Sequence, residues 1–126
     1  MTQARILIVG TNVAAATDLR NMLSVEGYEV SSARHPKEVG GYVDRFDLIL
    51  TDLPPHTDDL TCLRQLRGLC PTTPIVLMTA HGSLKTAVEG LKAGAFDYVS
   101  KPVTADEVRS IARRAVEHTH MPSAPP

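Results

Sequence analysis

Short, unbroken runs of apolar residues alternate with longer amphipathic segments along the chain. The runs occupy residues 5–9, 28–32, 46–53, 74–79 and 96–100. A short apolar run bounded by turn residues is typical of a strand that is covered on both faces by helices. We therefore predict five strands, with residues 46–53 in the middle of a parallel sheet. The run at residues 28–32 is shorter and partly alternating, which favours a position nearer the sheet edge.

The segments between these runs repeat their apolar residues at helical spacing. They predict five helices, in residues 13–26, 36–46, 60–68, 84–91 and 104–118. Gly27 and Gly94 stand where helices typically end. Thr104 and Glu107 form a capping-box pattern that starts the last helix. The second helix should be short, because Gly40 and its glycine neighbour weaken the pattern.

Alternating strands and helices with short connections imply an α/β fold built on a doubly wound, five-stranded parallel sheet, a (βα)5 flavodoxin-like arrangement. A chain of 126 residues has room for one domain. We assign residues 1–118 to this domain and expect residues 119–126 to be a disordered tail or linker, because they lack periodicity.

Composition narrows the class of protein. Hydrophobic residues make up 43% of the chain and charged residues 21%, which is typical of globular domains, and no apolar run is long enough to span a membrane. The expected location is the cytoplasm. A net charge of −1 gives no basic field that would attract nucleic acid or an anionic membrane to this chain. Cys62 and Cys70 are too few for a disulfide framework and are expected to be thiols.

Three chemically distinct side chains follow three of the predicted strands. Asp52 ends the central strand, Thr79 ends the next, and Lys101 follows the last. Carboxyl ends of parallel strands meet at one edge of a sheet, so a carboxylate, a hydroxyl and an ammonium should gather there. Such a set could hold a phosphoryl group, with the carboxylate as acceptor and the other two binding its oxygens.

Here the chain resembles the receiver domain of two-component response regulators. The resemblance lies in residues 6–9, 27–30, 47–53, 74–80, 92–98 and 101–102, and residues 81–93 are most similar to receivers of NtrC-type transcriptional activators. It implies that Asp52 is the phosphoacceptor, that Thr79 is the switch hydroxyl and that Tyr98 is the aromatic residue that turns inward on activation. It also implies that Lys101 binds the phosphoryl oxygen.

Two departures from the family pattern concern the metal. Receivers usually have two adjacent acids after the first strand that hold Mg²⁺, and here these positions are Gly10 and Thr11. One carboxylate is a poor site for this hard, octahedral cation, and Asp52 facing Lys101 is already close to charge balance. We therefore expect no metal ligands and no cofactor beyond, at most, weakly bound Mg²⁺ on Asp52.

The second departure lies in the loop after Asp52. The family usually has its proline at the fourth position after the phosphoacceptor, whereas here Pro55 comes third and Asp59 replaces the usual glycine. Pro54 stands where a backbone carbonyl would bind the metal, so the geometry of this loop should differ as well.

The resulting hypothesis is an atypical, pseudo-receiver-like domain, a phosphorelay signalling and protein-interaction module with impaired Mg²⁺-dependent phosphorylation and no enzymatic activity. By resemblance, its partners are a histidine kinase, an output domain or regulator, or a second copy of the chain. They would bind the helix in residues 84–91, the strand in residues 96–100 and the last helix. The alternative is a working receiver that a histidine kinase phosphorylates on Asp52, with Asp58 or Asp59 helping to bind metal.

Other interpretations of the same residues stay open. Asp52 and Lys101 could form a purely structural ion pair. Residues 10–12 could form a small phosphate or mononucleotide loop, although this segment has a single glycine. His56 and His81 could bind a transition metal with Asp52, although their spacing matches no ligand template.

Overall fold

The structure is a computed structural model that describes residues 4–38, 46–52, 60–79 and 84–120. Its strands are β1 (Arg5–Val9), β2 (Glu29–Ala33), β3 (Leu48–Asp52), β4 (Ile75–Thr79) and β5 (Asp97–Ser100). They form one parallel sheet in the order β2-β1-β3-β4-β5. This confirms the predicted fold class, with the expected central strand in the middle and β2 at an edge.

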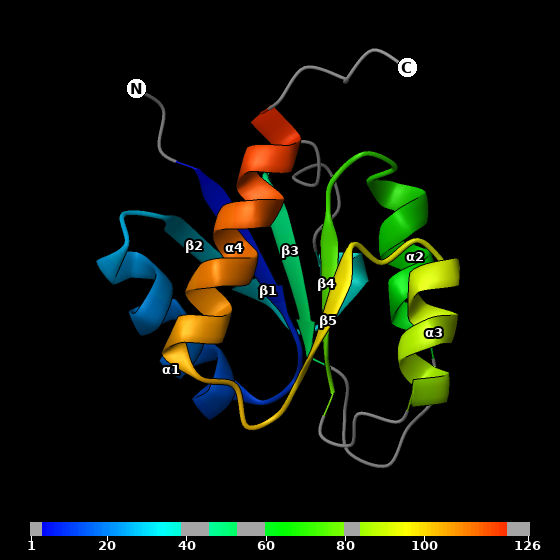
Figure 1. The fold of residues 1–126 in the computed structure, drawn as a ribbon, viewed down its shortest axis with the longest axis horizontal. Helices are drawn as coiled ribbons and strands as arrows, with labels where there is room; N and C mark the ends of the chain where they lie inside the picture. Colours follow the sequence, from blue (N-terminus) through cyan, green and yellow to red (C-terminus); the bar gives the residue numbers. More distant parts are fainter. Residues whose placement is uncertain (1–3, 39–45, 53–59, 80–83, 121–126) are drawn as a thin grey trace.

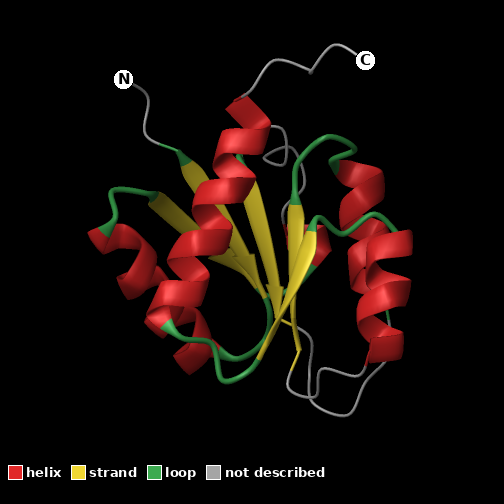
Figure 2. Ribbon diagram, in the orientation of Figure 1, coloured by secondary structure: helices red, strands yellow, loops and turns green. Residues whose placement is uncertain are grey.

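Helices cover both faces of the sheet (Figures 1 and 2). They are α1 (Val13–Val25), α2 (Thr61–Leu69), α3 (Leu84–Lys92) and α4 (Ala105–His120). Figure 1 shows α1 and α4 on one face and α2 and α3 on the other. Within the described residues, no helix is both long enough and apolar enough to cross a membrane.

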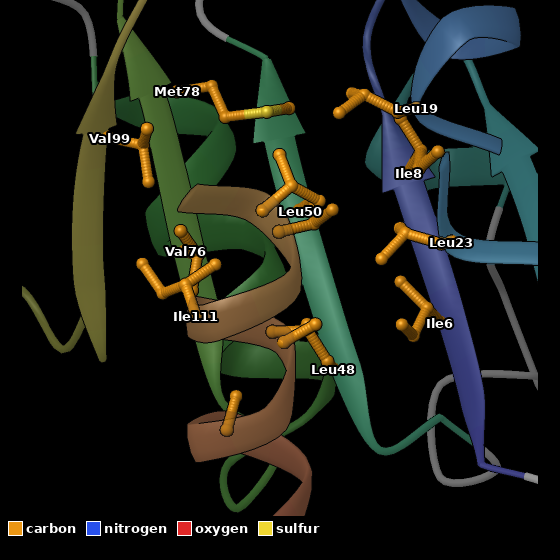
Figure 3. Close-up of a cluster of buried hydrophobic side chains, with 13 residues drawn as sticks. Ile6, Ile8, Leu19, Leu23, Leu48, Leu50, Val76, Met78, Val99 and Ile111 are labelled. Carbon is orange, nitrogen blue, oxygen red and sulfur yellow. The ribbon is translucent and has the colours of Figure 1, made fainter. Parts of the chain in front are cut away.

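Two hydrophobic cores lie on the two faces because side chains alternate along each strand. Leu48 and Leu50 of β3 belong to the core under α1 and α4, which Figure 3 shows in close-up. Ile49, between them, belongs to the core under α2 and α3. The same alternation directs Asp52 toward the α1 and α4 face and Thr51 toward the α2 and α3 face.

Local signals in the sequence account for the helix ends. Asn12 starts α1, since its Oδ1 accepts a hydrogen bond from the backbone N–H of Ala15 at 3.0 Å. Thr104 Oγ1 accepts one from the N–H of Glu107 at 3.2 Å, as the capping box predicts. Gly27 follows α1 with a φ of 91°, a conformation that favours glycine at a helix end.

The guanidinium of Arg67 joins the ends of α2 and α3. Its Nη1 donates to the carbonyls of Cys70 at 3.1 Å and Pro71 at 2.8 Å, and its Nη2 donates to the carbonyl of Gly94 at 2.9 Å. Gly94 has a φ of 109° and ends α3, as expected. Arg67 therefore ties the carboxyl ends of two helices that are far apart in the sequence.

Some predicted boundaries differ from the structure or lie outside it. Where a second helix was expected, the structure describes one 3₁₀ turn, Pro36–Glu38, and residues 39–45 lie outside the described residues. Helix α4 extends to His120, two residues into the segment assigned to the tail, whereas residues 121–126 are not described. The division into domain and tail stays a prediction. Neither cysteine forms a disulfide, as expected.

Tyr28 gives the fold a predicted sensitivity to alkaline pH. Burial raises the pKa of its phenol above the ordinary 10.0, Arg113 lowers it, and Glu26 and Glu117 raise it further. The folded state therefore holds this proton more tightly than the unfolded state, so its contribution to stability is complete below pH 10.0 and is lost as the pH rises above it. We expect Tyr28→Phe to flatten the fall of the free energy of unfolding above this pH, measured by urea titrations. Equal slopes in both proteins would contradict it.

Candidate functional site

The site is an ion pair at the carboxyl edge of the sheet. Asp52 is the last residue of β3, and Lys101 directly follows β5. The Nζ of Lys101 contacts the Oδ1 of Asp52. The side chain of Asp52 is only 7% exposed and that of Lys101 is 25% exposed, so the pair is largely removed from water. The structure thus brings together two of the four predicted site residues.

The backbone fixes Lys101 in reach of Asp52. The N–H of Lys101 donates to the carbonyl of Thr79 at 2.7 Å, which continues the pairing of β4 with β5 beyond the last strand residue. Because β4 lies between β3 and β5, Lys101 reaches across the end of β4 to the carboxylate. The ion pair and this backbone hydrogen bond together connect the carboxyl ends of β3, β4 and β5.

Thr79 and Tyr98, the other two predicted site residues, belong to the opposite face of the sheet. Leu77 and Tyr98 lie against the core under α2 and α3, and alternation along β4 puts Thr79 on the same face. The hydroxyl of Thr79 is buried, and its Oγ1 has no hydrogen-bond partner among the described residues. Thr79 was predicted to converge with the carboxylate of Asp52, but its hydroxyl makes no hydrogen bond to that carboxylate.

A second buried hydroxyl, that of Thr51, was not among the predicted site groups. It is only 1% exposed, and its Oγ1 has no hydrogen-bond partner among the described residues. Thr51 and Thr79 lie on the same face of adjacent strands, with Thr51 paired to Leu77 two residues before Thr79. A threonine within an apolar strand was the available signal, but high β-propensity explains it equally well.

Gly10 lies directly beside Asp52, which the sequence did not indicate either. The register of β1 and β3 pairs Val9 with Thr51, so the next positions, Gly10 and Asp52, face each other. A Cβ atom on Gly10 would lie 2.8 Å from the Cβ of Asp52. The residue pattern marks Gly10 as a missing acid and as the single glycine of a possible phosphate loop, but not as a neighbour of Asp52. Thr11, the next residue, is exposed to solvent.

The described residues do not fit a Mg²⁺ ion. No group of three or more acidic, histidine or cysteine side chains within these residues could hold a metal. Asp52, which is one carboxylate, already contacts an ammonium, and Gly10 brings no ligand while leaving no space for one. Mg²⁺ is usually held by one or two carboxylates, with waters completing its octahedral geometry, and here the one carboxylate is already paired with an ammonium. The other residues considered as ligands, His56, Asp58, Asp59 and His81, lie outside the described residues.

A mostly apolar cavity of about 270 Å³ lies next to the ion pair. Its walls come from α1, the end of β4 and the loop after β5, and include Leu19, Met22, Met78 and Val103. Apolar walls lower the local dielectric constant, which strengthens the attraction between the carboxylate and the ammonium. They also make either charge costly to leave alone.

Comparison with known proteins identifies relatives among bacterial regulators. The chain is 36% identical over 118 residues to the transcriptional regulatory protein ZraR of Escherichia coli K12, covering 91% of this chain and 27% of that protein. It is also 36% identical over 118 residues to the alginate biosynthesis transcriptional regulatory protein AlgB of Pseudomonas aeruginosa, covering 91% and 26%. The chain thus spans about a quarter of the length of these relatives.

Solved structures share the fold. A response regulator receiver domain protein from Clostridium thermocellum superimposes with a TM-score of 0.80 at 26% identity, covering 90% of this chain and 94% of that one. NtrX from Brucella abortus gives a TM-score of 0.80 at 30% identity, covering 94% of this chain and 28% of that one. The model of the response regulator receiver domain family matches residues 6–113. This chain therefore belongs to the receiver domain family of two-component response regulators.

Proposed function

We propose that this receiver domain is a protein-interaction module whose Mg²⁺-dependent phosphorylation on Asp52 is impaired. The single observation that supports the proposal is the direct contact of Asp52 with Lys101 beside Gly10. Phosphoryl transfer to a carboxylate requires an oxygen that can attack phosphorus while the bond to the donor breaks. It also requires cations that neutralise the phosphoryl oxygens. In this chain the carboxylate is covered, and one ammonium is the only cation beside it among the described residues.

The roles of the four site residues follow from this proposal. Asp52 keeps the position of a phosphoacceptor but acts as the partner of Lys101. Thr79 and Tyr98 keep the positions of the switch residues, on the face of the sheet covered by α2 and α3. The state of the domain is then set mainly by packing and by binding partners.

The proposed partners are proteins of the same signalling system, namely an output domain, a regulator, a histidine kinase or a second copy of this chain. The proposed surface is formed by α3, β5 and α4. It presents the exposed apolar side chains of Val88 and Leu91 on α3. It also presents an ion pair between Arg114 on α4 and Asp97 on β5, whose atoms lie 3.2 Å apart. Apolar residues next to charged ones are common at the centre and rim of protein interfaces.

Incubation with Mg²⁺ and a small acyl phosphate, followed by intact-mass measurement, tests the proposal. We expect only a minor fraction of the wild-type chain to gain a phosphoryl group, because the carboxylate is covered and ligands for the cation are few. Asp52→Asn is the matched control, since it keeps the volume of the side chain and removes the nucleophile.

Stoichiometric phosphorylation that disappears in Asp52→Asn would contradict the proposal and identify a working receiver. A parallel titration with Mg²⁺ alone should show no saturation up to about 10 mM, an affinity below that of ordinary protein sites for divalent cations. Saturation in the low millimolar range that is lost in Asp52→Asn would likewise count against it.

A further inference from the structure

The position of Gly10 in the sheet explains why it approaches Asp52 so closely. Residues that face each other on adjacent strands normally keep their backbones about 4.8 Å apart, with their Cβ atoms at a similar distance. A Cβ on Gly10 would instead lie 2.8 Å from the Cβ of Asp52, 3.5 Å from its carbonyl oxygen and 3.6 Å from its Cγ. The backbone of the turn after β1 therefore packs directly against the Cβ of Asp52.

Space rather than backbone conformation makes glycine necessary here. The φ angle of Gly10 is outside the left-handed region, unlike those of Gly27 and Gly94, so other residues can adopt its conformation. The atom that it approaches, the Cβ of Asp52, is bonded directly to the backbone, and no rotation of the side chain moves it away. A larger residue at position 10 must therefore shift one strand end against the other.

Hydrogen bonds on the far side of Gly10 oppose such a shift. The N–H of Gly10 donates to the carbonyl of Ala33 at 2.9 Å, which extends the pairing of β1 with β2. Two residues later, Asn12 caps α1. The turn is thus fixed to β2 on one side and to α1 beyond it, while Asp52 lies on the other side.

We propose that Gly10 is a positioning residue for the ion pair between Asp52 and Lys101. Its missing side chain lets the turn after β1 close on Asp52 and hold the carboxylate against the ammonium. The same closure leaves no room for a metal-ligating side chain at position 10, so the site excludes a divalent cation by shape as well as by charge. This inference rests on the proposed function, because it explains how the site would favour the ion pair over a metal.

A double-mutant cycle tests the contact between the two residues. Gly10→Ala should lower the melting temperature of the wild-type chain by about 5–10 °C, the effect of overpacking a tight contact. In an Asp52→Gly background, which lacks the Cβ that is approached, the same substitution should change the melting temperature by less than about 2 °C. In an Asp52→Asn background, which keeps that Cβ, the full loss should return.

Gly68 on α2 offers a matched control for the glycine-to-alanine change. A Cβ on Gly68 would meet no atom within 4 Å, so Gly68→Ala should raise the melting temperature slightly through better helix propensity. If Gly10→Ala alone does not fold, the prediction becomes that Gly10→Ala with Asp52→Gly does fold. Failure of both chains to fold would overturn the inference.

The reactivity of Lys101 separates positioning from general packing. Peptide-level mass spectrometry after brief treatment with an amine-acylating reagent should show Lys101 reacting at least about threefold faster in Gly10→Ala than in the wild type, because a displaced Asp52 no longer holds its ammonium. The exposed Lys85 and Lys92 should react at unchanged rates. Unchanged reactivity of Lys101, or an equal thermal loss in all three Asp52 backgrounds, would refute the role of Gly10.

These results are distinguishable from those that test the proposed function. Efficient phosphorylation of the wild-type chain would contradict the proposed function but would leave the melting temperatures of the double-mutant cycle as predicted. A neutral Gly10→Ala would end the present inference while leaving the phosphorylation result as predicted.

Discussion

Lys101→Met should lower the free energy of unfolding by about 2–3 kcal/mol, because it leaves the carboxylate of Asp52 without its cation. The side chain of Asp52 is 7% exposed and adjoins a mostly apolar cavity, so water replaces the lost ammonium only in part. Methionine keeps most of the length and apolar volume of lysine. The loss therefore reports mainly on the charge.

Removing the other partner of the ion pair, Asp52, should change the free energy of unfolding less. Asp52→Asn leaves Lys101 without its carboxylate, but the lysine side chain is 25% exposed and can turn toward solvent, so we expect a change within about 1 kcal/mol. The double variant, Lys101→Met with Asp52→Asn, retains neither charge. Its free energy of unfolding should lie within about 1 kcal/mol of that of the wild type. Urea unfolding of all four proteins measures these values. If the losses of the two single variants simply add, the ion pair does not couple the residues and the prediction fails.

Leu66→Ala should lower the free energy of unfolding by about 3 kcal/mol, an effect typical of a cavity left by a deleted leucine side chain. Leu66 is 0% exposed and belongs to the core that α2 forms with the sheet. Its loss removes apolar contacts from the face that also contains Thr79 and Tyr98.

Leu69 on the same helix provides the control. It is 43% exposed, so Leu69→Ala should cost less than about 1 kcal/mol. Chemical unfolding of both variants under identical conditions gives the comparison. Similar losses at the two positions would mean that α2 packs by a different face from the one described.

The order and type of most elements could be predicted because the three inner strands, β1, β3 and β4, are buried on both faces. In β3 and β4 the polar residues, Thr51, Asp52 and Thr79, stand only at the carboxyl ends, so the apolar runs before them are distinct even without any knowledge of tertiary structure. Helix ends were predictable where one residue decides them, as Gly27 and Thr104 do. The segment after Pro36 was the weakest prediction, because paired glycines remove the helical signal.

The site was only partly predictable from the sequence. The pairing of Asp52 with Lys101 follows from the rule that strand ends gather at one edge. The contact between Gly10 and Asp52 depends on how far a turn leans across a neighbouring strand, a matter of one or two ångströms that no residue pattern encodes. The face on which Thr79 lies was implicit in the alternation along β4. Whether its hydroxyl finds a hydrogen-bond partner depends on tertiary packing, which the sequence pattern does not give.

The ion pair between Asp52 and Lys101 also affects how such a domain would respond in a cell. If the proposed function holds, a site whose counter-ion is part of its own chain would not depend on the supply of magnesium or of a high-energy phosphate donor. Under the proposed function, the fraction of domain in a complex would follow mass action, set by partner concentration and dissociation constant. The output would then report how much of each protein is synthesised, on the timescale of expression and degradation rather than of covalent modification.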